Sequence, residues 1–290
     1  MNRFVIFAGA VFATSISVAS ACTAAPSEPI SFTLSPERGS DSIQASFKSN
    51  LGRGRDSNWS TSFRPAELAG LDVAGFRSAG SRPLRFALVR EAGRLDCAGR
   101  GGDSRASGGC SFTPDPGFIQ LLESRRIGRP TNEQALGLMA VNVRRELIDA
   151  IAAANYPTPT IDNLMALSAL GIDEHYIAGM ARAGYRPNTL DALVQFKALE
   201  ITPQWIGGFV RIGYADLPAD ELMQLKALNI TPEYIAGFDR VGYHHLPVDK
   251  LVQLKALDIT PEFVRSVAGP SGQMPDVAKL MELKTVGGRY

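Results

Sequence analysis

Two stretches of this sequence lie 29 residues apart and differ at only two positions: LKALNITPEY, residues 225–234, and LKALDITPEF, residues 254–263. Self-comparison at the same offset extends the match over much of the C-terminal half. Apolar residues recur three and four positions apart, which places them on one face of a helix. We expect four apolar columns to form the core: Leu164, Leu193, Leu222, Leu251 and Leu280; Leu167, Phe196, Leu225, Leu254 and Leu283; Leu170, Leu199, Leu228 and Leu257; and Ile172, Ile201, Ile230 and Ile259.

A second helix in each unit is marked at both ends. It begins with an N-cap threonine followed by a first-turn proline, as in Thr202-Pro203. It ends where Gly184, Gly213 and Gly242 supply a left-handed residue, each followed by tyrosine. An aromatic column runs along these helices and could form a ladder for a sugar or peptide, but its helical spacing favours a core position. The column is Tyr176, Trp205, Tyr234 and Phe263.

The repeat predicts a stack of helical hairpins. We expect five units over residues 131–275 and a final half unit ending at Tyr290. Gly179, Gly208 and Gly237 recur inside the second helix, where glycine is unfavourable. Their recurrence predicts that another backbone approaches closely there. One hairpin buries too little surface to fold alone, so neighbouring units must stack.

Residues 30–112 alternate between apolar and polar side chains, which is typical of half-buried strands. About six strands would form a small antiparallel sandwich or a curled sheet. Cys97 and Cys110 fall on two strands of a predicted hairpin with its tip near residues 102–105, where they would face each other. We therefore predict a disulfide between them; the alternative is two free buried thiols.

The N-terminus has the features of an export signal. Arg3 precedes an apolar run over residues 4–12, and Ala19-Ser20-Ala21 provides small residues for cleavage. The run is too short to span a bilayer. Cys22 follows directly and is a candidate lipidation site, although Ala19 replaces the usual Leu or Val of a lipoprotein signal; ordinary cleavage nearby is the alternative. We expect an exported protein, periplasmic or tethered by lipid, without a membrane span in the mature chain.

The predicted fold class is therefore α+β, with four segments along the chain. These are a signal peptide over residues 1–25, an antiparallel β domain over 26–115, a linker over 116–130 and an all-α array of stacked helical hairpins over 131–290.

Two basic columns recur in the array: Lys197, Lys226 and Lys255, and Arg182, Arg211 and Arg240. They could form a positive stripe for an acidic partner. We favour the interpretation that they complement the dipoles at helix C-termini. The formal net charge of +1 gives no reason to expect nucleic acid as a partner. The adjacent His244 and His245 make a poor metal site, because no cysteine or acid cluster accompanies them in the sequence.

The unit LKALxITPE followed by an aromatic residue resembles helical repeats in the extracytoplasmic C-terminal regions of some BlaR-like M56 metallopeptidases of bacterial envelopes. Residues 84–93 and 112–116 resemble the region that precedes those repeats. The sequence departs from that family in lacking the His-Glu-x-x-His zinc motif, since its histidines are His175, His244 and His245. The resemblance thus implies a free-standing sensory or interaction region without the peptidase.

We expect a protein that is not an enzyme and needs no cofactor or metal. Its function would be that of a protein–protein interaction or sensory module acting through the array, with another envelope protein as partner. The alternative is a binder of cell-wall glycan or another envelope ligand through the β domain.

Overall fold

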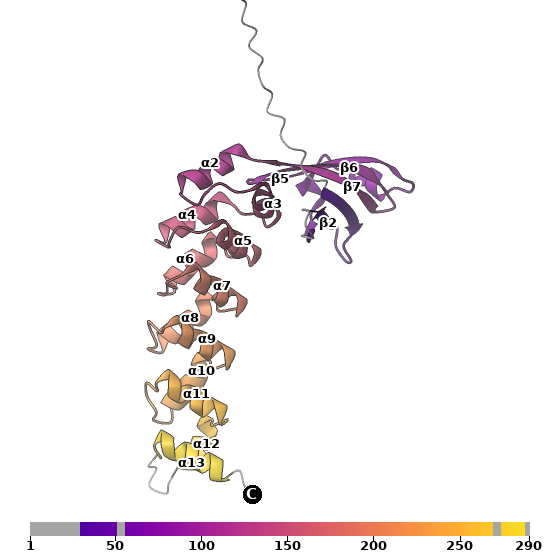
Figure 1. Cartoon of the computed structure of the whole chain (residues 1–290). Helices are drawn as coiled ribbons and strands as arrows, with labels where there is room; N and C mark the ends of the chain where they lie inside the picture. The colour runs from indigo at the N-terminus through magenta and orange to yellow at the C-terminus, as the bar shows by residue number, and fades with distance from the viewer. Residues whose placement is uncertain (1–29, 51–55, 269–273, 288–290) are drawn as a thin grey trace, which may run out of the picture.

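The computed structural model describes residues 30–50, 56–268 and 274–287. It has the predicted α+β organisation, with an antiparallel β domain followed by a stack of short helices. In Figure 1 the stack leaves one end of the β domain and extends away from it as a column. The predicted signal peptide, residues 1–25, and the candidate lipidation site Cys22 lie outside the described residues.

The strands form one antiparallel sheet in the order β3-β2-β1-β7-β6-β5-β4. This is one strand more than the six expected, because the short β4 has no alternation of its own to reveal it. A helical turn, η1 (Pro65–Glu67), and the helix α1 (Val73–Arg77) lie between β3 and β5. The strands are β1 (Ile30–Pro36), β2 (Ile43–Asn50), β3 (Asp56–Phe63), β4 (Leu68–Ala69), β5 (Arg82–Arg90), β6 (Gly93–Gly102) and β7 (Arg105–Pro114).

The sheet is curled around its own core. The rings of Phe32 on β1 and Phe86 on β5 are 5.0 Å apart, although β7 and β6 lie between these strands. Neighbouring strands are about 4.8 Å apart, so a flat sheet would hold the two rings about 14 Å apart. Of the two predicted forms, the structure therefore has the curled sheet. Its interior is filled by side chains that include Ile30, Leu34, Phe47, Leu88 and Leu95.

The β6–β7 hairpin carries the predicted disulfide. Cys97 and Cys110 are directly opposite each other in the register and are joined by a bond between their sulfur atoms. The hairpin turns at Asp103 and Ser104, which both have positive φ. The amide of Ser104 donates to the carbonyl of Phe76, so the tip is tied to α1.

Residues 116–130, predicted as a linker, begin with the helix α2 (Pro116–Ser124). Phe118 and Leu122 of this helix are buried, and Asp115 caps it. α2 lies 29 residues before α4 (Arg145–Ala153) in the sequence. The linker prediction is wrong: α2 is the second helix of an earlier unit, in which the β domain replaces the first helix.

Five complete hairpins follow α2 in the described part of the chain. We call the first helix of each hairpin A and the second B. The units are unit 1, α3 (Asn132–Ala140) with α4; unit 2, α5 (Ile161–Ala169) with α6 (Glu174–Arg182); unit 3, α7 (Leu190–Ala198) with α8 (Pro203–Arg211); unit 4, α9 (Ala219–Ala227) with α10 (Pro232–Asp239); and unit 5, α11 (Val248–Ala256) with α12 (Pro261–Ser266). The A helix of the half unit, α13 (Val277–Gly287), ends the stack.

The predicted caps of the B helices are present in the structure. Thr202 accepts a hydrogen bond from the amide of Trp205 at the start of α8, and the matching threonines do the same in α10 and α12. Gly184, Gly213 and Gly242 have positive φ after the B helices. A second left-handed column, which we did not predict, follows the A helices: Asn142, Gly171, Glu200, Asn229 and Asp258.

Three of the four predicted core columns are buried, and one is not. The columns of Leu164, Leu167 and Ile172 are almost fully buried through units 2 to 5. In the third column Leu170, Leu199 and Leu228 are 39%, 37% and 36% exposed, so their assignment to the core is wrong. Each of these leucines is the C-cap of an A helix. The next residue is left-handed and turns the chain, so the leucine side chain stays outside the core.

The glycine column lies at a close approach, but a side chain makes it. A Cβ atom built on Gly208 would lie 2.7 Å from Cγ of Pro232, the first residue of the next B helix. Gly179 faces Pro203 and Gly237 faces Pro261 in the same way. The predicted backbone approach is therefore wrong, because a proline ring from the following unit fills the space.

Candidate interaction surface of the array

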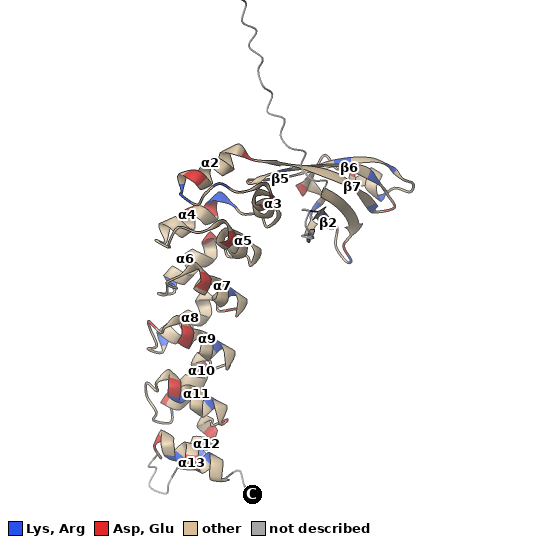
Figure 2. Ribbon diagram, viewed as in Figure 1, with Lys and Arg blue, Asp and Glu red and all other residues tan. Residues whose placement is uncertain are grey.

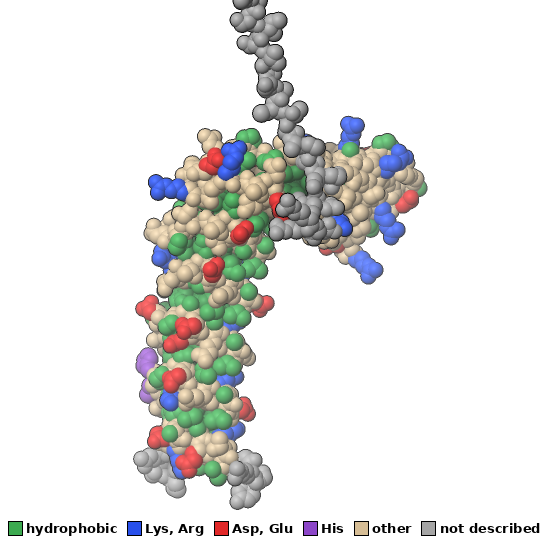
Figure 3. Space-filling view, in the orientation of Figure 1, with side chains coloured by type: hydrophobic (Ala, Val, Ile, Leu, Met, Phe, Trp, Pro, Cys, Tyr) green, Lys and Arg blue, Asp and Glu red, His purple; other side chains and the backbone are tan. Residues whose placement is uncertain are grey.

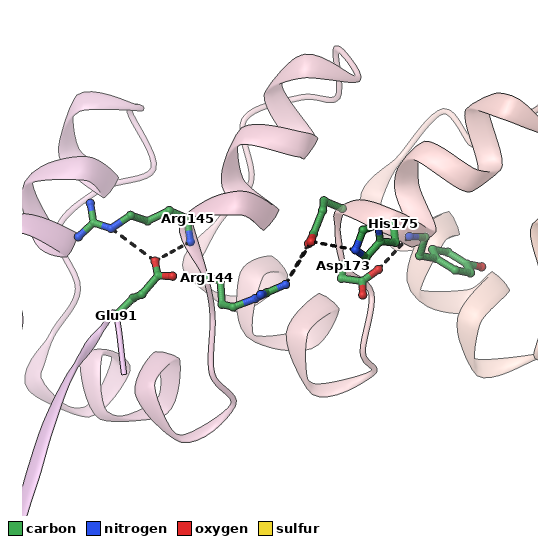
Figure 4. A network of polar contacts seen from close by, with 7 residues as sticks. Glu91, Arg144, Arg145, Asp173 and His175 are labelled. Atoms are coloured by element: carbon green, nitrogen blue, oxygen red, sulfur yellow. Dashed lines mark hydrogen bonds and ion pairs between the residues drawn. The ribbon is translucent and has the colours of Figure 1, made fainter. Parts of the chain in front are cut away.

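The turn between β5 and β6 fixes the β domain to unit 1. The Arg90 guanidinium donates to the carbonyls of Met139 and Ala140 at 2.7 and 2.6 Å, where α3 ends. Burial lowers the pKa of Arg90 from its ordinary value. Glu91 accepts a hydrogen bond of 2.8 Å from the amide of Arg145 at the start of α4 (Figure 4). The cation Arg90 thus lies at the C-terminus of α3, and the anion Glu91 lies at the N-terminus of α4. Helix dipoles favour both placements.

The predicted lysine column lies over aromatic rings. Each lysine extends from an A helix across the aromatic residue of the B helix in the preceding unit. The lysine nitrogens lie 4.8 to 5.6 Å from the ring centroids, in the pairs Lys197 with Tyr176, Lys226 with Trp205, Lys255 with Tyr234 and Lys284 with Phe263. Such contacts are attractive. These lysines are half-buried between units instead of standing free as a basic stripe.

The predicted arginine column lies at the ends of the B helices. Arg182 and Arg240 donate from Nε to the carbonyls of Ala178 and Ala236 on their own helices, and Arg211 is exposed. These contacts fit the interpretation that the arginines complement helix dipoles. In the A helices α7, α9 and α11, acidic residues lie in the first turn and lysines in the last turn. Figure 2 accordingly shows red near one end of these helices and blue near the other.

The aromatic column connects neighbouring units. The Tyr176 hydroxyl donates to the carbonyl of Ile201 at 2.7 Å, and the Tyr234 hydroxyl donates to that of Ile259 at 2.8 Å. Burial raises the pKa of Tyr176 to about 12, so the hydroxyl keeps its proton and its donor role at neutral pH. The column therefore holds units together and does not form an open ladder.

The exposed leucines form a row that we call the leucine edge: Leu170, Leu199 and Leu228, continued by Leu257 and Val286. Leu257 is half-buried, whereas Val286 at the end of the array is 60% exposed. An exposed alanine precedes each leucine of the row. Hydrophobic side chains also follow the whole length of the array on the face seen in Figure 3. The periodicity of the sequence identifies the leucines of this row, but it wrongly predicts that they lie in the core.

A groove of about 270 Å³ lies between units 1 and 2, and we call it the first-junction groove. It occurs where the aromatic and lysine columns are interrupted. Leu147 stands 29 residues before Tyr176, and Ser168 stands 29 residues before Lys197. The groove is lined by Val141, Asn142, Arg144, Leu147, Ser168, Gly171, Ile172, Asp173 and Glu174.

Charged side chains line this groove, among them Arg144 and Asp173, which are labelled in Figure 4. The Arg144 guanidinium lies 3.1 Å from the Glu174 carboxylate, and Nε2 of His175 lies 3.5 Å from the same group. Asp173 caps α6 by accepting from the amide of Tyr176 at 2.8 Å. Arg144 occupies the N-cap of α4 without capping it, because Glu91 has that role. We did not predict this site, although the interruption of both columns could have revealed it.

The paired histidines lie next to different side chains. His244 lies 3.6 Å from Asp239, and the ring of His245 lies near that of Tyr214. No group of three or more histidine, cysteine and acidic side chains suited to a metal ion occurs in the described parts of the chain. Within the same residues, no helix combines the length and apolar character required to cross a membrane.

Comparison with protein-family models, with curated proteins and with solved structures found no match to this chain. The resemblance to BlaR-like envelope proteins therefore stays a prediction.

Proposed function

We propose that this chain is an exported envelope protein that binds another envelope protein through its helical array. The β domain would hold the array in a fixed direction through Arg90 and Glu91, which bond to both helices of unit 1. The disulfide supports placement in an oxidising compartment. The function itself would be non-catalytic, with stacked repeats offering an extended binding surface.

The leucine edge is the observation that carries this proposal. Leu170, Leu199 and Leu228 expose more than a third of their surface at equivalent positions in three successive units. Isolated exposed leucines are ordinary, whereas an aligned apolar row is typical of an interaction site. A partner covering the row would remove these side chains from water, which is favourable.

The spacing of the row suits a helical partner. The A helices of units 1 and 2, of units 2 and 3, and of units 4 and 5 are in contact, and packed helices lie about 8–10 Å apart. An α-helix rises about 10.5 Å over seven residues. A partner helix with an apolar residue at every seventh position could therefore contact one leucine per unit.

Cross-linking in the native envelope tests this proposal. The variant L199S/L228S removes two members of the row, and Q195S/Q224S changes exposed residues of the same two helices. We expect the wild type and the glutamine variant to give the same cross-linked envelope protein, and the leucine variant to lose it. A cross-linking pattern unaffected by the leucine changes, or no specific product from the wild type, would contradict the proposal.

The β domain supports a second candidate, binding of cell-wall glycan or another envelope ligand. A shallow groove of about 450 Å³ on this domain is lined by groups that can form hydrogen bonds with a sugar, including Arg94, Asp96 and Ser111. Sedimentation of the protein with purified cell wall would test this candidate. Binding that is lost in R94A/S111A but retained in L199S/L228S would favour the β domain over the array.

A further inference from the structure

We propose that the first-junction groove binds an aromatic side chain, preferably tyrosine, of a protein partner that lies along the leucine edge. This inference rests on the proposed function and specifies what the partner must present. Val141, which lines the groove, lies 29 residues before Leu170 and is likewise the C-cap of its A helix. The groove therefore continues the leucine edge toward the β domain.

The other junctions show what fills this position. In the five others of the described chain, a ring from a B helix lies under a cation from the next unit. The pairs are Phe118 with Arg145, Tyr176 with Lys197, Trp205 with Lys226, Tyr234 with Lys255 and Phe263 with Lys284. Between units 1 and 2 the positions of Tyr176 and Lys197 are occupied by Leu147 and Ser168. Both are smaller, and the groove is found at this junction.

The size and lining of the groove suit one side chain. Its volume of about 270 Å³ is just below the range of about 300–1,000 Å³ for small-molecule sites, so a single ring fits better than a larger ligand. Leu147 and Ile172 provide apolar walls. Arg144 provides a guanidinium at the border, and an arginine can lie against an aromatic face.

A backbone carbonyl favours tyrosine over phenylalanine. In the next junction Tyr176 donates to the carbonyl of Ile201, and Ile172 lies 29 residues before Ile201. No donor within the described residues bonds to the carbonyl of Ile172, a residue that lines the groove. The nearby Ser168 hydroxyl donates instead to the carbonyl of Val141 at 2.7 Å. A partner's tyrosine hydroxyl could therefore make the bond that Tyr176 makes in its own junction.

The test uses p-cresol, the side chain of tyrosine, as a probe of the full mature protein. Binding is followed by NMR of the leucine and isoleucine methyl groups. We expect p-cresol to shift Leu147 and Ile172, and toluene to bind about fivefold more weakly because it lacks one hydrogen bond.

Two reciprocal variants identify the site. L147Y/S168K gives the groove the residues of its neighbours, so p-cresol binding should fall at least about tenfold, a difference of about 1.4 kcal/mol. Y176L/K197S removes the ring and cation from the next junction and should create a second site near Ile201. Binding that survives in L147Y/S168K would overturn the proposal. If L147Y/S168K does not fold, the absence of a second site in Y176L/K197S would overturn it as well.

The two proposals fail in distinguishable ways. If p-cresol does not bind at Leu147 but the leucine-dependent cross-link persists, the groove proposal is wrong and the interaction function stands. If p-cresol binds at Leu147 but the wild type gives no specific cross-link, the interaction function is wrong. If both hold, L147Y/S168K should also weaken the cross-link.

Discussion

The β domain and the helical array bury apolar surface in different ways. In the sheet, strands far apart in sequence must meet, since Ile30 near the start of the domain pairs with Cys110 near its end. In the array, contacts join neighbouring units, as in the bond from Tyr176 to Ile201 over 25 positions. A change in the array should therefore act on a unit and its neighbours, whereas a change in the sheet should affect the whole domain.

The two tryptophans allow the regions to be followed separately. Trp59 stacks on Phe47 in the sheet with ring centroids 4.2 Å apart. Trp205 packs against Phe209 in α8, in the middle of the array. The variant W205F retains only Trp59, so its fluorescence reports on the β domain. The variant W59F retains only Trp205, so its fluorescence reports on the array.

The largest expected effect comes from a buried leucine of the array. Leu225 is fully buried, and its replacement by alanine should lower the free energy of unfolding by about 2–5 kcal/mol. Leu228 ends the same helix but is 36% exposed, so L228A should change the free energy of unfolding by about 0.5 kcal/mol or less. Urea titration followed by Trp205 measures both. Equal costs for the two leucines would contradict the distinction between core and edge.

Removing the disulfide should affect the other region. C97S/C110S opens a loop closed over 13 positions and should destabilise the β domain by about 3 kcal/mol. Denaturation followed by Trp59 should show this loss, while the Trp205 transition should move less. If both transitions move equally, the sheet and the array unfold as one unit and the comparison fails.

Arg90 bonds the β domain to the array, and its replacement should have an intermediate effect on the free energy of unfolding. R90M removes the donors to two carbonyls at the end of α3, which should cost about 1.5–3 kcal/mol. The exposed Arg85 on the same strand provides the control R85M, with little expected change. Besides the loss of stability, R90M should separate the Trp59 and Trp205 transitions further. Transitions that stay unchanged in R90M would show that other contacts couple the regions.

Local chemistry made much of the fold predictable. The Thr-Pro starts and glycine ends of the B helices depend on residues within one turn, and the structure has both. The register of β6 with β7 followed from a short hairpin. The sequence does not decide between a sandwich and a curled sheet, since the contact of Phe32 with Phe86 depends on three-dimensional packing.

The misassigned features depend on where a helix stops. Leu228 has the same spacing as Leu222 and Leu225, but periodicity does not show that Asn229 adopts a left-handed conformation. The 29-residue repeat does not reveal α2, because unit 1 lies between α2 and the regular units and departs from the repeat at Arg144 and Leu147. Those same departures border the first-junction groove, so the weakest part of the periodic signal contains the candidate site.

The smallest expected effect concerns the glycine column. G208A places a methyl group 2.7 Å from Cγ of Pro232, and such overpacking costs about 1–3 kcal/mol. Alanine gains about 1 kcal/mol over glycine inside a helix, so the net loss should be about 1 kcal/mol. In units 1 and 2 the positions of Gly208 and Pro232 are occupied by Ala150 and Glu174, so alanine is accommodated where no proline faces it. G208A/P232E should therefore be more stable than G208A when followed by Trp205. If the second change gives no recovery, the proline ring is not what requires glycine at this position.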